Sequence, residues 1–358
     1  MESRNTAKRR ERVTDSNLLF AIAAVIFVLM YGVGMLSHPH DFLQAQTFFD
    51  FFNLNGALII LTLGESIVMV GGSIDISIGQ VTALVTVSCA LFLQSGTGSV
   101  GGALLLALGI GIAFGLLQGF LIAYLKIQPF IITLAGMFLA SGLVTTIHEN
   151  PISVTMPAFV HLMNFQIVIP WLGTLNRLGR FIPLSIDLAT LVVLFLAVAL
   201  VTLMNWSRFG RNLYAVGGNY QSALMLGINA KRTRFYSHVL CGLLAGVAGF
   251  VFLMSTGAGN VGNAYGFEIK AIAGSIIGGT LLIGGVGNLI GSPIGALTLL
   301  AINELIRVAG VNSDYQAIVS GLLLCFFIVL QNVVMRLRGT DSFKLALPGW
   351  LLPARRAR

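Results

Sequence analysis

The sequence predicts an all-α polytopic membrane protein with about ten transmembrane helices, some of them broken by glycine-rich segments. Of its 358 residues, 56% are hydrophobic and 9% are charged, and the mean hydropathy is +0.90. A soluble domain has about 45–50% apolar and about 25% charged residues, so this composition excludes a water-facing surface. At about 20 residues a span, ten spans use roughly 200 residues. The remainder is too short for a separate soluble domain of useful size.

The first apolar segment, 18–36, follows a polar and basic tail. Its apolar core is longer than that of a signal peptide, and no cleavage site follows it, so we expect an uncleaved span. The glycine-rich stretch 274–295 could form two short or broken helices, which leaves eight or nine spans as alternatives. The chain has 42 glycines, many even for membrane helices that pack through small residues. The other expected spans lie near 54–70, 79–95, 101–124, 130–148, 184–204, 236–256, 269–287, 289–308 and 316–335.

Lysine and arginine predict the orientation, because short cytoplasmic loops retain positive charge. Of the 21 basic residues, 17 fall on one side of a ten-span topology. We therefore expect both termini to be cytoplasmic. Basic tails beside a span usually contact anionic lipid, so no nucleic-acid partner is expected. The predicted organisation is a basic tail at 1–17, one transmembrane domain at 18–335 with a cytoplasmic loop at 205–235 and an outer loop at 149–183, and a second basic tail at 336–358.

Motifs for several kinds of chemistry are missing from the sequence. It contains no Gly-Lys pair, so it cannot cradle ATP phosphates in a Walker A loop. It has no G-x-S-x-G or H-E-x-x-H motif, and its three cysteines lie in apolar runs typical of packing positions. His38 and His40 have no third metal ligand nearby, which favours a solvated loop. We predict no catalytic residue and no metal site.

Acidic residues inside apolar segments are costly and usually functional. The candidates are Glu65, Asp75, Asp187 and Glu304. Glu304 lies three residues before Arg307, a spacing at which the two neutralise each other on a helix. Glu65 has two interpretations. It either makes an interhelical hydrogen bond or lines a cavity, or it couples protons in a secondary carrier.

The segment 71–80 interrupts an apolar stretch. Gly71 and Gly72 break the helix, and Asp75 and Ser77 can hydrogen-bond to the backbone groups that are freed. Irregular backbone at membrane depth survives only where it is buried in protein or lines a cavity. Asp75 is expected as the N-cap of the following span, which is compatible with a place beside a pathway.

A second segment, 207–229, lies in the cytoplasmic loop. Asn219 is a good N-cap, 220–226 is expected to be a short helix, and Gly227 is its expected C-terminal stop. A helix this short is marginal in water, so packing must hold it. Its three consecutive apolar residues, Leu224 to Leu226, either dock on a partner or pack on the chain's own spans.

Four separated segments carry a resemblance to a known family. They are GGSIDISIG at 71–79, KIQPFIITLAGM at 126–137, RFGRNLYAVGGNYQSALMLGIN at 208–229 and GGTLLIGGVG at 278–287. In this order they resemble the permease subunits of ribose- and galactofuranose-type sugar ABC importers, and the resemblance covers roughly 15–340.

The resemblance implies a cytoplasmic helix at 219–228 that couples the permease to a separate ATPase subunit, which binds ATP and Mg. The coupling loop would comprise Gly217, Gly218, Asn219, Ser222, Ala223, Leu226, Gly227 and Ile228. A charge introduced by Ala223→Glu is then expected to uncouple transport. The competing hypothesis is a proton-coupled secondary carrier that uses Glu65.

The resemblance further implies a place in the bacterial cytoplasmic (inner) membrane and three more partners. A soluble sugar-binding protein would dock on the outer loops, and a second permease, identical or sister, would complete the pathway for a monosaccharide. Candidate pathway residues are Glu65, Gly71, Gly72, Asp75, Ser77, Gly278 and Gly279.

Overall fold

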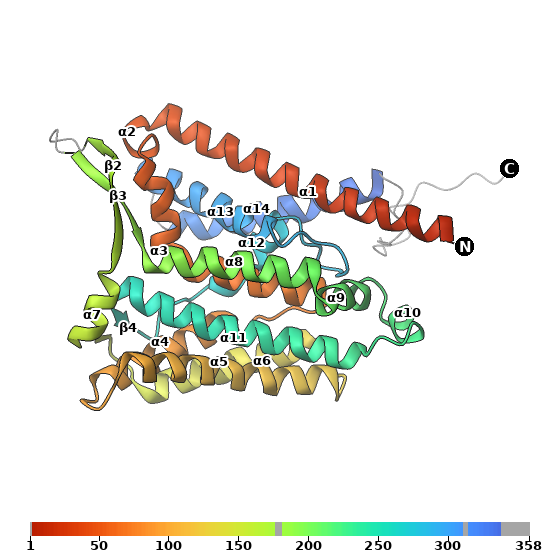
Figure 1. Ribbon diagram of the computed structural model, residues 1–358, viewed down its shortest axis with the longest axis horizontal. Helices are drawn as coiled ribbons and strands as arrows, with labels where there is room; N and C mark the ends of the chain where they lie inside the picture. Colours follow the sequence, from red (N-terminus) through yellow and green to blue (C-terminus); the bar gives the residue numbers. More distant parts are fainter. Residues whose placement is uncertain (1, 176–180, 311–313, 338–358) are drawn as a thin grey trace.

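The computed structural model describes residues 2–175, 181–310 and 314–337 (Figure 1). Arg177, Arg180 and the predicted C-terminal tail from Arg338 onward lie outside these residues. The helices are α1 (Glu2–Ser37), α2 (Pro39–Phe42), α3 (Ala45–Val70), α4 (Ile78–Gln94), α5 (Val100–Ala123), α6 (Pro129–Ile147), α7 (Pro157–Met163), α8 (Leu188–Trp206), α9 (Arg208–Gly218), α10 (Tyr220–Met225), α11 (Ala230–Thr256), α12 (Phe267–Ile277), α13 (Gly291–Val308) and α14 (Asp314–Leu337).

Within the described residues, six helices are long and apolar enough to cross a membrane: α1 from Leu18, α3, α5, α6, α8 and α11. The predicted spans at 79–95 and 316–335 correspond to shorter apolar helices, α4 and part of α14. The predicted span at 269–287 is not one helix. Helix α12 ends at Ile277, and α13 begins only at Gly291. The broken-helix alternative is confirmed, because Gly279, Gly284 and Gly285 adopt positive φ, which a regular helix does not contain.

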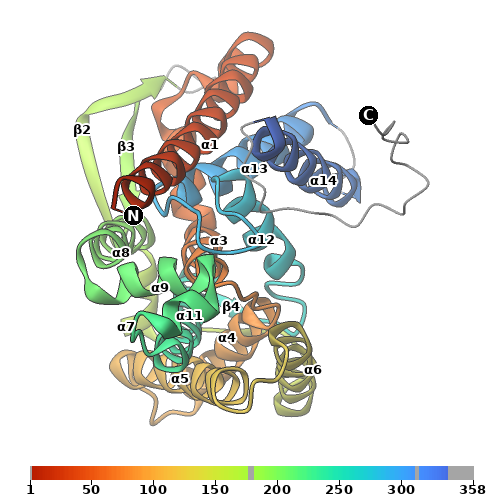
Figure 2. The same ribbon diagram turned by 90° about the vertical axis from the view of Figure 1, so that its right-hand side faces the viewer.

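Helix α3 joins two groups of helices (Figure 2). On one side α11 packs against α4 and α5, and α6 packs against α4 and α5. On the other side α12 and α13 pack against each other and against α14, and α1 covers α13. In the most apolar 18-residue stretch of α3, 89% of the residues are buried, whereas in the corresponding stretch of α5 only 22% are. An apolar helix covered on all sides is central, and one with an open apolar face meets lipid.

Glycines set the distance between α5 and α11. A Cβ on Gly115 would lie 2.7 Å from the carbonyl oxygen of His238, and one on Gly242 would lie 2.8 Å from Cα of Gly115. Gly111 and Gly246 face the opposite backbone at similarly close range. Gly111 and Gly115 are four residues apart on α5, and Gly242 and Gly246 are four residues apart on α11. Together they form the small-residue contact by which membrane helices approach closely. This contact accounts for part of the high glycine content.

Two small antiparallel sheets add strands that the sequence analysis did not predict. β1 (Ile152–Ser153) pairs with β4 (Ala258–Gly259), and β2 (Gln166–Leu175) pairs with β3 (Phe181–Asp187) with an irregularity between Ile169 and Gly173. The β2–β3 hairpin and α7 lie at the end of the molecule opposite α9 and α10 (Figure 1). The segment 149–183, predicted only as an outer loop, therefore contains β1, β2 and the start of β3, where β-branched isoleucine and valine favour strands.

Candidate functional site

The cytoplasmic loop folds as the local sequence signals predict. Asn219 is the N-cap of α10, and its side-chain oxygen accepts a hydrogen bond of 2.8 Å from the Ser222 N–H. Gly227 has φ +77°, so it ends the helix in the left-handed region. The Ile228 N–H bonds to the Ala223 carbonyl, and the Gly227 N–H bonds to that of Leu224. These two bonds form the paired closure of a Schellman motif. The short helix and both of its ends are confirmed.

Helix α10 has one buried side and one exposed side. Ala223 is buried and packs with Val216 and Ala230 from the flanking helices α9 and α11. Met225 and Leu226 are 87% and 78% exposed. The helix packs on its own chain through Ala223, whereas Leu224, Met225 and Leu226 are exposed, so docking on a partner stays a prediction for that face. A glutamate at Ala223 would disrupt packing within the chain, so it does not test docking, which requires a change on the exposed side.

The end of α9 meets two glycine-rich breaks that are distant in the sequence. The Gly285 N–H donates a 2.8 Å hydrogen bond to the Val70 carbonyl at the end of α3. A Cβ on Gly217 would overlap that same carbonyl oxygen, and one on Gly284 would lie 2.6 Å from Cα of Gly72. The segments 71–72, 217–218 and 284–285 thus touch backbone to backbone. We call this contact the glycine junction.

A tyrosine ties α9 to the glycine-rich segment 278–290. The Tyr214 hydroxyl donates a 3.0 Å hydrogen bond to the Gly287 carbonyl. Burial raises the pKa of the Tyr214 hydroxyl to about 12, so the group is a neutral donor at physiological pH. Displacement of α9 therefore strains or breaks a bond to the glycine-rich segment.

The other two predicted pathway glycines lie apart from the junction. A Cβ on Gly278 would meet the backbone of Gly291 and Ser292 at the start of α13. Gly279, at φ +94°, packs against Leu19 of α1. Each allows close contact between the segment 278–290 and a neighbouring helix.

Glu65 and Asp75 are buried next to each other where the chain turns between α3 and α4. Both carboxylate oxygens of Glu65 lie 3.3 Å from the Asp75 backbone nitrogen and accept its hydrogen bond. The structure thus gives Glu65 a concrete structural role, which is to satisfy a buried N–H freed by the helix break.

Asp75 is not the N-cap of α4. The N-cap is Ser77, and Asp75 lies two residues earlier. The Asp75 carboxylate accepts bonds from the Ser77 N–H at 2.9 Å and from the Ser77 hydroxyl at 2.6 Å. As expected, the Asp75 carboxylate bonds to a backbone group freed by the break, but this bond closes an Asx turn before the helix begins. Asp75 lies too early to cap α4 because a turn at Ile76 and Ser77 separates it from the helix, which begins at Ile78.

Three further buried polar residues join this network, and the sequence analysis missed them. Gln118 of α5 donates a 2.8 Å hydrogen bond to the Ser77 hydroxyl. His238 of α11 shares a 2.9 Å bond between its Nε2 atom and the Ser73 hydroxyl, and its Nδ1 atom lies 3.9 Å from an Asp75 carboxylate oxygen. The sequence signal for this network was His238 itself, because an ionisable residue inside an apolar run is usually functional.

The other two acidic candidates, Asp187 and Glu304, lie toward the end of the molecule that carries α2. Glu304 and Arg307 form the expected i,i+3 ion pair, with two hydrogen bonds between them. Asp187 is the N-cap of α8, and its backbone N–H donates to the side chain of Asn53. Among the residues that the structure describes, no group of three or more histidine, cysteine, aspartate or glutamate side chains could hold a metal ion.

Comparison with known proteins decides the family. Residues 47–328 match the family described as the permease component of a branched-chain amino acid transport system. The chain is also 36% identical to the inner membrane ABC transporter permease protein YjfF of Escherichia coli, over 88% of this chain and 92% of the relative. This chain belongs to that permease family. As a permease component it is a transport subunit and not the ATPase.

Two further relatives extend over nearly the whole permease. The fructose import permease protein FruG of Bifidobacterium longum is 31% identical over 91% of this chain and 94% of its own length. The ribose import permease protein RbsC of Escherichia coli is 29% identical over 91% and 98%. The family match runs from α3 into α14, so it includes the glycine junction, the buried network and α10.

Proposed function

We propose that this permease is one membrane subunit of an ATP-driven importer that moves a monosaccharide through the bacterial inner membrane. The observation that carries the proposal is the two-sided α10, which is capped at both ends, is held to the chain through Ala223, and presents Met225 and Leu226 outward. A helix that is packed on its own chain on one side and exposes apolar side chains on the other can bind in a groove of a partner protein. The partner would be a separate ATPase subunit, which binds ATP and Mg.

The glycine junction suggests how movement of α10 reaches the membrane. Helix α10 packs on α9, and the end of α9 contacts both the Val70 carbonyl and the backbone of Gly285. Because these contacts are between backbone atoms, no flexible side chain lies between the segments to absorb a displacement of one of them. Displacing α10 by ATPase closure would therefore shift the break at 71–77 and the segment 278–290 together. Of the candidate pathway residues, Gly71 and Gly72 belong to this contact. Asp75 and Ser77 follow in the same break, and Glu65 accepts the Asp75 N–H.

The orientation follows from charge. Arg208, Arg211, Lys231 and Arg232 belong to the helices at the α10 end of the molecule, where the N-terminus also lies (Figure 1). The positive-inside rule makes this end cytoplasmic. The chain would then cross the membrane ten times, with α4 as a partial span that begins at the break 71–77 and α12 as one that ends at the glycine-rich segment 278–290. The β2–β3 hairpin would face the outside, where a soluble sugar-binding protein delivers the substrate.

The remaining components follow from the family. A second permease, identical or sister, would complete the pathway. A monosaccharide is favoured as the substrate because two relatives are named as fructose and ribose import permeases. The C-terminal tail from 338 onward has no assigned role.

The test changes the exposed face of α10. Leu226→Glu places a charge where an apolar contact is proposed, and we expect about a tenfold or greater loss of co-purified ATPase and of ATP-driven uptake. Leu43→Glu makes the same change at a 62% exposed leucine beside α2 and serves as the matched control. Both variants are purified by tag from native membranes in mild detergent, and a co-purifying subunit is identified by its Walker A sequence and its ATP hydrolysis. Purification of the unmodified chain without any ATPase would overturn the proposal, as would equal ATPase recovery with Leu226→Glu and Leu43→Glu.

A further inference from the structure

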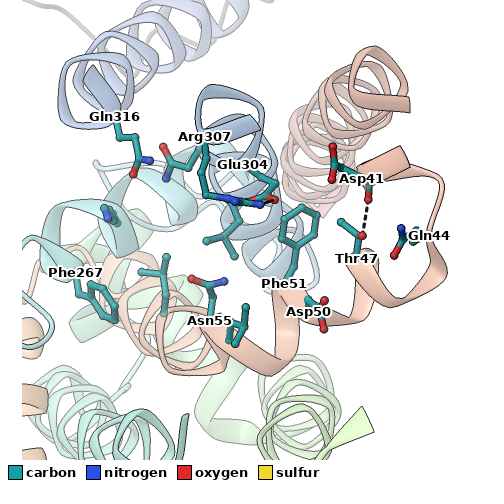
Figure 3. Close-up of a pocket in the computed structure, with 15 residues that line it drawn as sticks. Asp41, Gln44, Thr47, Asp50, Phe51, Asn55, Phe267, Glu304, Arg307 and Gln316 are labelled. Atoms are coloured by element: carbon teal, nitrogen blue, oxygen red, sulfur yellow. Dashed lines mark hydrogen bonds and ion pairs between the residues drawn. The ribbon is translucent and has the colours of Figure 1, made fainter. Parts of the chain in front are cut away.

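A pocket of about 400 Å³ lies at the α2 end of the molecule, opposite α10. Its walls come from α2 and the first half of α3 on one side and from α12, α13 and α14 on the other (Figure 3). In Figure 3, Asn55 and Phe51 of α3 lie across the pocket from Glu304 and Arg307 of α13. This volume is within the range of small-molecule sites, about 300–1,000 Å³.

Side-chain amides approach the pocket from three helices. Asn55, Asn303 and Gln316 line it from α3, α13 and α14. The side-chain oxygen of Asn303, Oδ1, is buried and accepts no hydrogen bond from the described part of the chain. A buried polar atom left without a partner costs free energy, so its presence indicates a ligand or water that supplies the donor.

The backbone of α3 departs from helical geometry at this pocket. Asn55 has φ −121° and ψ 20°, which marks a kink inside an otherwise continuous helix. A kinked backbone at this depth is tolerated where it lines a cavity. Leu58, one turn further on, lines the pocket and lies seven residues, about 10 Å, before Glu65 on the same helix. The pocket and the buried network are therefore two sites along the same helix, α3.

The charges of the pocket are largely engaged within the protein. Arg307 is neutralised by Glu304 through two hydrogen bonds. The Asp50 carboxylate accepts a 2.7 Å bond from Gln46. Lys270 is a second cation in the lining, and its Nζ lies 5.8 Å from the centroid of the Phe267 ring. A zwitterionic amino acid needs a cation for its carboxylate and an anion for its ammonium group, so it would have to compete with the Glu304–Arg307 pair or with the contact between Lys270 and Phe267. Amides and partly engaged carboxylates suit the hydroxyl groups of a neutral ligand, which both donate and accept.

Aromatic rings complete the site. Phe51 and Phe267 line the pocket from α3 and α12, and leucines lie beside them. Apolar faces of this kind cover the C–H surfaces of a ring, while a few placed polar groups fix its orientation. We propose that this pocket is an outward-facing binding site for a neutral monosaccharide within the permease itself. The inference rests on the proposed import function and assigns a substrate contact to this chain in addition to the soluble binding protein.

The first experiment measures binding to the purified full-length chain in detergent. The probes are radiolabelled D-ribose, D-fructose, D-galactose and L-leucine. One of the sugars is expected to bind and L-leucine is not. Asn303→Leu removes the unpartnered side-chain oxygen at similar volume and should raise the Kd for that sugar about tenfold or more. Asn164→Leu, at the exposed end of α7 outside the pocket, is the matched control and should leave the Kd unchanged.

A second measurement does not depend on a loss of binding. Thr47→Cys places a thiol at the pocket in a Cys325→Ser background, where the two other cysteines are buried. The bound sugar should slow alkylation of this thiol by a maleimide, and L-leucine should not. The inference is overturned if none of the sugars binds or protects Thr47→Cys, if Asn303→Leu leaves the Kd unchanged, or if L-leucine alone binds.

The two proposals fail in different ways. Co-purification of an ATPase with no sugar binding to the pocket leaves the import function standing and removes the pocket assignment. Sugar binding that depends on Asn303, in a chain that purifies without an ATPase, removes the import function and leaves the pocket assignment standing.

Discussion

Adding one methyl group at the glycine junction tests whether its backbone contacts are as close as the structure shows. Gly217→Ala would place Cβ on the Val70 carbonyl oxygen and 2.7 Å from the Gly285 nitrogen. Real Cβ atoms do not approach backbone this closely, so α9 must move away from α3. The movement also stretches the 2.8 Å hydrogen bond between Gly285 and Val70.

Three contributions set the size of the effect. Overpacking a close contact costs about 1–3 kcal/mol, and weakening one hydrogen bond costs up to about 1 kcal/mol. Replacing glycine by alanine in a helix returns up to about 1 kcal/mol. The net expectation is a destabilisation of about 1–3 kcal/mol. For a large domain this lowers the Tm by roughly 2–10 °C.

The assay is thermal unfolding of the purified chain in detergent at one fixed scan rate, because unfolding of such proteins is often irreversible. Gly109→Ala is the matched control, since no atom of the described residues lies within 4 Å of a Cβ built there on α5. Its Tm should stay the same or rise. If Gly217→Ala unfolds at the same temperature as Gly109→Ala, the junction is not closely packed and the route proposed from α10 to the membrane is wrong.

Two further outcomes are expected. Asn219→Ala removes the cap that accepts the Ser222 N–H and should cost about 1 kcal/mol; hydrogen exchange should quicken within 220–226, with Gln221→Ala, an exposed position of the same helix, as the control. Glu65→Gln retains an acceptor for the Asp75 N–H and should keep ATP-dependent uptake, whereas Glu65→Leu leaves that N–H unpaired and should destabilise the chain by about 1–3 kcal/mol. Loss of a proton-driven uptake in Glu65→Gln would contradict this structural role.

Local sequence determined the features whose partners lie within a few residues. The caps of α10 depend on Asn219, Ser222 and the positive φ of Gly227, all within one short stretch. The same is true of the Glu304–Arg307 pair and of the break that follows Gly71 and Gly72. These elements were predictable because capping, turn formation and i,i+3 pairing act along the chain, and composition and the span pattern likewise fixed the membrane environment.

Only the tertiary structure decided which of these elements meet. The sequence marked the glycines near 72, 217 and 285 but not their contact, because backbone approach depends on how three separate helices pack. It likewise could not show that Ala223 faces inward, that His238 joins Ser73, or that Asn55 and Asn303 line one pocket. Each of these relations joins residues from different elements. The packing of separate helices against one another sets these relations, and no local sequence pattern records it.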